Sequence, residues 1–182
     1  MKEVEIKIEI GNADQVLRNL EAFGCKFSAP VSQLDTVFVP ADVLALPCPA
    51  GTNVLRIRKQ GEKFLFTLKR SDAGNHLSKL EHELEILDPK KLESILTELG
   101  YKRISIVSKM RRKCKFKEFE VCLDAVEGLG NFLEIETMTD GDAFAAQRDM
   151  LKFLAECGID SAKRAEYGYD VLYFQKHGTG TI

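Results

Sequence analysis

Hydrophobic and charged residues alternate strictly near the start of the chain. Over residues 3–10, EVEIKIEI, valine and isoleucine occupy the even positions, and glutamate or lysine occupies the odd ones. A period of two is typical of a β-strand that has one apolar face and one polar face. By itself this strand has two interpretations: its charged face lies in water, or it faces a charged interior.

The same alternation recurs in six later segments, and in each of them the polar face carries charges of one sign. Three of these segments are basic and three are acidic. The basic positions are Arg56, Arg58, Lys69, Lys109 and Arg111, and the acidic ones are Glu81, Glu83, Glu85, Glu120, Asp124, Glu134 and Glu136. Repetition over so many strands favours the charged interior.

Three segments have the period of amphipathic helices, and each ends at a glycine. They span residues 13–23, 89–99 and 141–157, and the second follows Asp88 as N-cap with Pro89 at the first helical position. Such helices need an apolar sheet surface to cover, which the apolar strand faces supply. We therefore expect helices outside a sheet whose charged faces line an interior.

Loops and the chain end have their own signals. Residues 39–53 hold three of the five prolines, which predicts a loop, and a second loop is expected at residues 71–76. Residues 177–182 are expected to be a flexible tail. The length predicts a single domain over residues 1–176.

The chain contains an internal repeat with an offset of 76 residues, the separation of Gly24 and Gly100. At this offset Glu5 matches Glu81, and the helix position Leu20 matches Leu96. Strand, helix, glycine and returning strand therefore occur twice. A solenoid needs shorter and more numerous repeats, so we expect a two-fold pseudosymmetric sheet structure.

A charged interior implies a charged ligand. Buried charges that lack compensation are costly, and like charges close together repel each other. Paired carboxylates suit a hard divalent cation such as Mg²⁺ or Mn²⁺, and arginine and lysine suit phosphate oxygens. The separate acidic and basic strands thus predict a polyphosphate with bound metal.

Composition excludes several classes of protein. The net charge of −2 argues against a nucleic-acid coat or a membrane-surface protein, and no apolar run approaches the roughly 18 residues that span a bilayer. An RNA-binding sheet would need aromatic residues between its basic ones. Five cysteines without a CxxC pair indicate free thiols in a reducing compartment, and we expect the cytoplasm.

Taken together, these motifs resemble the CYTH superfamily, the triphosphate tunnel metalloenzymes, over nearly the whole chain. In chain order the matching motifs are ExExK at residues 3–7, the strand arginines Arg56 and Arg58, the TLK-like strand at 67–69, KxR at 109–111, and the Asp, GLGxF and ExE run at 123–136. The GLGNF run and the DTVF segment at 35–38 look most similar to the class IV adenylyl cyclase branch.

The resemblance implies an α+β fold with an eight-stranded antiparallel β-barrel, a tunnel covered outside by helices. The expected metal ligands are Glu3, Glu5, Asp124, Glu134 and Glu136. The expected phosphate-binding residues are Lys7, Arg56, Arg58, Lys69, Lys109 and Arg111, and the expected catalytic residues are Lys7, Glu134 and Glu136. Glu81, Glu83 and Glu85 are either a second acidic wall or a solvated face and partners for the basic strands.

The resemblance implies an enzyme that needs Mg²⁺ or Mn²⁺ and acts on a nucleoside triphosphate or another triphosphate. Conversion of ATP to cyclic AMP and pyrophosphate is the leading hypothesis, and an inorganic or thiamine triphosphatase is the alternative. A non-catalytic nucleotide-binding module would need fewer carboxylates. We expect a monomer or homodimer that binds neither nucleic acid nor membrane, and a Glu134→Gln variant that is at least as stable without metal as the parent.

Overall fold

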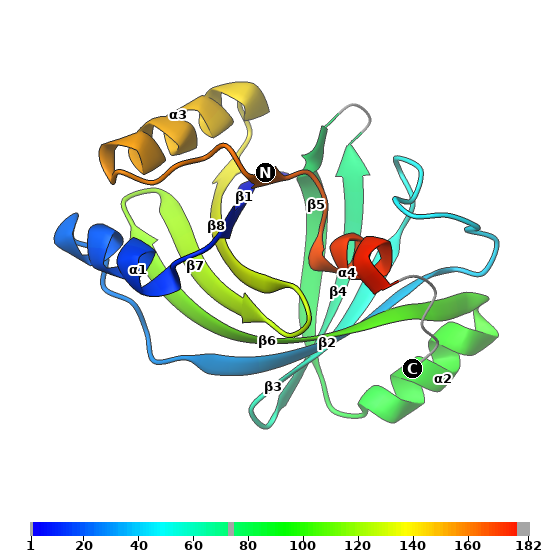
Figure 1. The fold of residues 1–182 in the computed structure, drawn as a ribbon. Helices are drawn as coiled ribbons and strands as arrows, with labels where there is room; N and C mark the ends of the chain where they lie inside the picture. Colours follow the sequence, from blue (N-terminus) through cyan, green and yellow to red (C-terminus); the bar gives the residue numbers. More distant parts are fainter. Residues whose placement is uncertain (1, 73–74, 178–182) are drawn as a thin grey trace. The chain divides into compact units, whose positions relative to one another are not determined.

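A computed structural model describes residues 2–72 and 75–177. Along the chain the elements are β1 (Lys2–Ile10), α1 (Ala13–Ala22), β2 (Val31–Pro40), β3 (Val54–Gln60), β4 (Lys63–Asp72), β5 (Asn75–Ile86), α2 (Pro89–Glu98), β6 (Tyr101–Phe116), β7 (Phe119–Val126), β8 (Gly130–Thr139), α3 (Ala143–Glu156), β9 (Arg164–Ala165) and α4 (Tyr169–His177). The expected α+β fold with an antiparallel sheet is confirmed (Figure 1). Nine strands replace the expected eight, because the short β9 pairs with β1.

The chain divides into two compact units, here called unit 1 and unit 2. Unit 1 contains residues 1–31 and 109–166, and unit 2 contains residues 32–108 and 167–182. In unit 1 the strands follow the order β6-β7-β8-β1-β9, and in unit 2 the order is β5-β4-β3-β2 with β6 next to β2. The single domain over residues 1–176 stays a prediction.

The three expected helices are present, and each begins at a residue whose side chain caps it. Asn12 accepts a hydrogen bond from the amide of Gln15, and Asp88 accepts one from the amide of Lys91. The third helix starts two residues later than predicted, because Asp142 rather than Asp140 provides the cap.

The helix α4 was not predicted from the sequence. It places Tyr169 and Val171 in buried positions, but it is short and has little amphipathic pattern. It also includes His177, the first residue of the expected tail, and residues 178–182 lie outside the described part of the chain.

The long predicted loop is confirmed except for Val39 and Pro40, which belong to β2, and the short one is not confirmed. The described residues 41–53 contain neither helix nor strand. The loop expected at 71–76 was wrong for four of its six residues, since β4 reaches Asp72 and β5 begins at Asn75. Residues 73–74 are not described.

The internal repeat is present in the order of the elements. Strand, helix, glycine and returning strand occur as β1, α1, Gly24 and β2, and again as β5, α2, Gly100 and β6. Both glycines have a positive φ, 102° and 80°, which a residue with a side chain rarely adopts. Each glycine therefore ends its helix and turns the chain into the returning strand.

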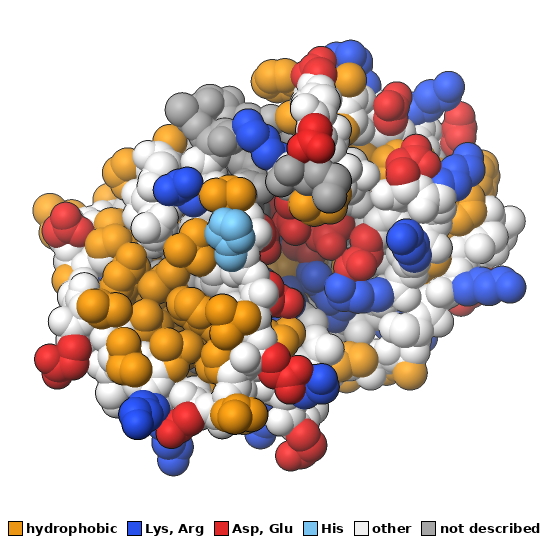
Figure 2. Space-filling model, turned by 180° about the vertical axis from the view of Figure 1, so that it is seen from behind, with side chains coloured by type: hydrophobic (Ala, Val, Ile, Leu, Met, Phe, Trp, Pro, Cys, Tyr) orange, Lys and Arg blue, Asp and Glu red, His pale blue; other side chains and the backbone are white. Residues whose placement is uncertain are grey.

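Helices cover the apolar strand faces, more fully in unit 1 than in unit 2. In unit 1, α1 and α3 pack on β1, β7 and β8 through residues such as Leu20, Phe153 and Leu154 (Figure 1). In unit 2, Leu96 of α2 packs against Phe38, Leu55 and Ile57. Leu84 of β5 remains 55% exposed. Separately, Figure 2 shows a broad hydrophobic area on one face of the molecule.

The cysteines are free, as expected. Cys25, Cys114, Cys122 and Cys157 are buried and Cys48 is partly buried, without a disulfide between any of the five. Among the described residues, no helix is both long and apolar enough to cross a membrane.

Candidate functional site

The charged faces of the strands in unit 1 are buried, and they bring the predicted site residues together. The buried members are Glu5, Lys7, Lys109, Arg111, Asp124 and Glu134. The pairing of the strands sets their neighbours, because it places Glu5 opposite Glu136 and Lys7 opposite Glu134 on β1 and β8. The same register logic places Arg111 opposite Asp124 on β6 and β7. Charged side chains of four strands thus share one interior.

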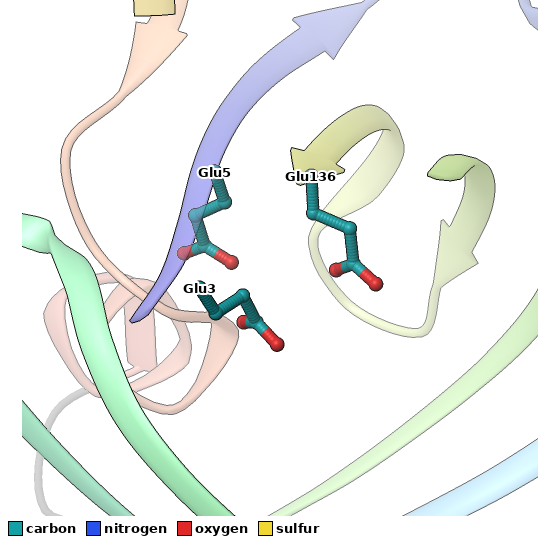
Figure 3. Close-up of side chains that lie close together, drawn as sticks. All are labelled: Glu3, Glu5 and Glu136. Atoms are coloured by element: carbon teal, nitrogen blue, oxygen red, sulfur yellow. The ribbon is translucent and has the colours of Figure 1, made fainter. Parts of the chain in front are cut away.

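Three carboxylates form the first part of this site. Glu3 and Glu5 of β1 and Glu136 of β8 each offer an oxygen, and these oxygens lie within 4.8 Å of one another (Figure 3). Glu5 is buried and the other two are partly buried. Three convergent carboxylates match the oxygen ligands that Mg²⁺ and Mn²⁺ prefer, so this trio fits the metal that the sequence predicted.

The trio carries electrostatic repulsion that the protein alone does not relieve. Burial raises the pKa of Glu136, and the carboxylates of Glu3 and Glu134 add to this effect, so that its pKa is about 8. Arg111 acts in the opposite direction without cancelling the shift. A bound cation would compensate this charge.

The other two predicted metal ligands, Asp124 and Glu134, lie against cations instead. Arg111 donates its Nε to Asp124 at 2.7 Å and its Nη2 to both Asp124 and Glu134. Lys7 Nζ lies 3.1 Å from Glu134 and 3.6 Å from Glu5, and Lys109 Nζ lies 3.6 Å from Asp124. These two acids therefore lie among basic residues, and neither belongs to the carboxylate trio.

These contacts reverse the expectation for Glu134→Gln. Burial alone would raise the pKa of Glu134, but Arg111, Lys7 and Lys109 hold it well below its usual range. The negative charge of Glu134 therefore stabilises the metal-free protein, and neutralising it should cost stability. The repulsion that the sequence suggested is concentrated at Glu136.

In unit 2, Arg58 has a partner that sequence analysis missed. Its Nε and Nη2 donate to the two oxygens of Asp35, at 2.6 and 2.7 Å, and both residues are buried. Asp35 lies directly opposite Arg58 in the register of β2 and β3, and the sequence alone does not give this register. A bidentate buried pair fixes this guanidinium firmly.

The neighbouring Arg56 is held more loosely. Its Nη2 donates to Thr67 Oγ1 at 2.9 Å and to Glu83 Oε2 at 3.2 Å. Thr67 in turn donates its hydroxyl to Glu83 at 2.9 Å. The Nε of Arg56 is buried and has no hydrogen-bond partner within the described part of the chain. Arg56 therefore has donor capacity that its carboxylate neighbour does not use.

The acids of β5 are partners for the basic residues of β3 and β4. Glu81 pairs with Lys69, Glu83 pairs with Arg56, and Glu85 lies 2.8 Å from Lys63. The structure thus gives these glutamates the ion-pair role that was one of the two sequence interpretations.

Two charged residues of unit 1 and a thiol were not assigned to the site from the sequence. Lys113 pairs with Glu120, and Glu120 lies opposite Glu136 on the neighbouring strand. Burial opposes the shift, but Lys113 and a hydrogen bond with Glu136 lower the pKa of Glu120. Cys122 lies between Glu120 and Asp124 on the same strand face, and burial raises the pKa of its thiol. Strand alternation alone would have placed all three.

A comparison with known protein families shows which family the chain belongs to. The CYTH domain model matches residues 1–169. The chain belongs to the CYTH family.

Two relatives match this chain over most of its length. A Methanocaldococcus jannaschii protein with a provisional adenylate cyclase name is 34% identical over 138 residues, which cover 75% of this chain and 77% of the relative. The adenylate cyclase CyaB of Aeromonas hydrophila is 27% identical over 172 residues, which cover 93% and 87%.

Solved structures share the fold. A conserved hypothetical protein from Pyrococcus furiosus superimposes with a TM-score of 0.79 at 27% identity, and the match covers 92% of this chain and 98% of the other. A Hippeastrum protein described as having a dominant triphosphatase activity gives a TM-score of 0.65 at 20% identity, over 98% and 96% of the two chains.

Proposed function

We propose that this CYTH protein is a divalent-metal-dependent enzyme that acts on a triphosphate, and that it converts ATP to cyclic AMP and pyrophosphate. The observation that carries the proposal is the convergence of Glu3, Glu5 and Glu136, together with the raised pKa of Glu136. A purely structural ion network has no reason to keep three acids together at this cost, whereas a site that takes up a cation does.

Glu3, Glu5 and Glu136 would hold Mg²⁺ or Mn²⁺ through carboxylate oxygens. When bound, the cation supplies positive charge that stabilises the charge developing on the phosphate oxygens during the reaction. The ammonium of Lys7 lies between Glu5 and Glu134 and is almost fully buried, with 2% of its side chain exposed. It is therefore positioned to bind a phosphate oxygen next to the metal.

Lys109 and Arg111 complete the cationic side of unit 1. Asp124 and Glu134 fix both cations, because Arg111 contacts both acids and Lys109 contacts Asp124. We assign Asp124 and Glu134 the role of orienting these cations, and Arg111 and Lys109 the role of binding phosphate. In unit 2 the corresponding phosphate-binding role falls to Arg56 and Lys69, and Arg58 stays paired with Asp35.

In the cyclase reaction the ribose 3′-hydroxyl attacks the α-phosphorus and gives its proton to solvent water. The bond from the α-phosphorus to the bridging oxygen breaks, and pyrophosphate departs with its electron pair. The chain's contribution is orientation and charge: its basic side chains hold the phosphate groups so that the attacking and leaving oxygens are in line. Two relatives with adenylate cyclase names support this reaction.

The second candidate is a triphosphatase, in which water attacks the terminal phosphorus instead. A solved protein of the same fold is described with a dominant triphosphatase activity, so the fold is compatible with hydrolysis as well. The same charged residues would bind the phosphates in both reactions, and the nucleophile makes the difference.

Product identification tests the proposal. The protein is incubated with ATP, tripolyphosphate or thiamine triphosphate, each with Mg²⁺ or Mn²⁺ and each with EDTA, and the products are separated by chromatography. We expect cyclic AMP and pyrophosphate from ATP with metal and no product with EDTA. Phosphate release without any cyclic nucleotide would replace the cyclase by the triphosphatase, and no turnover of any triphosphate would contradict the proposal as a whole.

A further inference from the structure

We propose that Glu81 and Glu83 of β5 are built-in competitors of phosphate: they hold Lys69 and Arg56 in its absence and give way when it binds. Glu81 and Glu83 would then set how tightly unit 2 binds a triphosphate. This inference rests on the proposed function, because it takes phosphate to be the ligand of Arg56 and Lys69.

The hydrogen-bond donors of Arg56 are only partly used by its neighbours. Its side chain is only 13% exposed, yet its buried Nε finds no acceptor among the residues that the structure describes. A guanidinium offers its donors in a planar fork that a phosphate group can match with two oxygens. Glu83 engages just one edge of this fork, through Nη2 at 3.2 Å. A ligand that offers more oxygens would therefore bind Arg56 better than Glu83 does.

The neighbouring arginine shows what a permanent partner looks like in the same strand. Asp35 takes two hydrogen bonds from Arg58, at 2.6 and 2.7 Å, and both residues are buried. Glu83, in contrast, has 43% of its side chain exposed and makes the longer contact. An exposed ion pair is weak because water and salt compete with it. Arg58 thus has a lasting counter-ion and Arg56 an exchangeable one.

Charge explains why a counter-ion is needed before ligand binds. Arg56 is buried beside Arg58, and burial and this second positive charge lower the pKa of Arg56. Asp35, Glu81 and Glu83 act in the opposite direction. The carboxylates of β5 therefore balance the charge of these basic residues, and each would withdraw when phosphate brings its own negative charge.

Lys69 follows the same scheme. It pairs with Glu81, and the two side chains stay partly accessible, 23% and 16% exposed. A lysine ammonium binds as a point charge with three donors, so it can change from a carboxylate to a phosphate oxygen without moving far.

Calorimetric titration with inorganic tripolyphosphate, in EDTA and again with Mg²⁺, tests the proposal, using the parent chain and the variants Glu83→Gln and Glu81→Gln. Each variant should bind tripolyphosphate more tightly than the parent, by about 1.5- to 5-fold for a partly exposed ion pair. The matched control is Glu93→Gln on α2, since Glu93 also pairs with an arginine, Arg103, and its side chain is 42% exposed. This control should bind like the parent. Thermal melts establish that all four proteins are folded.

The outcomes separate this inference from the function on which it rests. Variants that bind tripolyphosphate as well as the parent or more weakly would overturn the competitor role and leave the proposed function standing. A loss of binding that appears only with Mg²⁺ would make the two glutamates metal ligands, which also overturns it. An equal gain in Glu93→Gln would reduce the effect to general charge and overturn it too. If the folded parent binds no tripolyphosphate with or without metal, the proposed function fails and this inference with it.

Discussion

Unit 1 and unit 2 share the alternating strand pattern but compensate their charges differently. The polar strand face of unit 1 carries seven acids and five bases: Glu3, Glu5, Glu9, Glu120, Asp124, Glu134 and Glu136 against Lys7, Lys109, Arg111, Lys113 and Lys115. On the described strands of unit 2, four ion pairs join Asp35, Glu81, Glu83 and Glu85 to Arg58, Lys69, Arg56 and Lys63. One unit therefore has carboxylates to spare for a cation, whereas in the other a phosphate must displace a carboxylate.

The two units also differ in how far helices cover their apolar strand faces. In the repeat, β4 of unit 2 corresponds to β8 of unit 1. The helix α3 follows β8 and packs on β1 and β8, whereas β4 is followed directly by β5, with residues 73–74 between them. The apolar face of unit 1 is consequently buried under two helices, and Leu84 in unit 2 stays exposed. The repeat therefore reproduces the strands and their first helix. The number of helices on the apolar face and the balance of acids and bases differ between the two units.

The largest effect is expected from removing a ligand of the carboxylate trio. Glu136→Gln should lower metal-dependent turnover of a triphosphate by orders of magnitude, because the cation that stabilises developing charge would be held poorly. Steady-state assays of product formation at saturating Mg²⁺ check this. Turnover within a few-fold of the parent would exclude Glu136 from the metal site.

Stability should distinguish two glutamates that lie two residues apart on β8. Glu134→Gln should destabilise the metal-free protein by about 3–5 kcal/mol, because it removes the charge of a buried carboxylate that both Arg111 and Lys7 contact. Glu136→Gln should stabilise it by about 2–4 kcal/mol at pH 8, since it removes a carboxylate whose pKa is raised to about 8. Urea unfolding in EDTA measures both, and equal signs for the two variants would contradict the comparison.

Substitutions of the two arginines of β3 should also have different effects on binding and on stability. Arg56→Gln should weaken tripolyphosphate binding by about 1.5–3 kcal/mol with little loss of stability, because its partner is an exposed carboxylate. Arg58→Gln should mainly destabilise the fold, since it removes the bidentate partner of the buried Asp35. Calorimetry combined with thermal melts tests this, and a stability loss confined to Arg56→Gln would reverse the assignment.

The last effect concerns pH. The folded pKa of Glu136 is raised to about 8 from 4.5, so between these values the folded protein binds more protons than the unfolded chain. The free energy of unfolding without metal should therefore fall as pH rises from about 5 to 8. The lowered pKa of Glu134 acts only below its ordinary value and does not mask this trend. Urea unfolding across this range should show a shallower slope in Glu136→Gln than in the parent, and identical slopes would contradict the raised pKa.

Local pattern predicted the strands, their two faces and three of the four helices, because alternation and glycine-ended amphipathic segments are properties of short stretches. It could not assign partners within the charged face. Glu134 and Glu136 share one strand face, but the register with β1 places Lys7 opposite the first and Glu5 opposite the second. That register joins residues more than 120 positions apart, and it decides which acid is neutralised and which one repels its neighbours.

Manganese binding to the metal-free protein tests the central claim most directly. Mn²⁺ is titrated into the parent and into Glu136→Gln without any triphosphate, and free Mn²⁺ is measured by electron paramagnetic resonance. The account predicts that the parent binds Mn²⁺ through the trio and that the folded variant binds it at least roughly tenfold more weakly, since one of three carboxylate ligands is lost. Equal affinities in the two proteins would show that Glu3, Glu5 and Glu136 do not form the metal site.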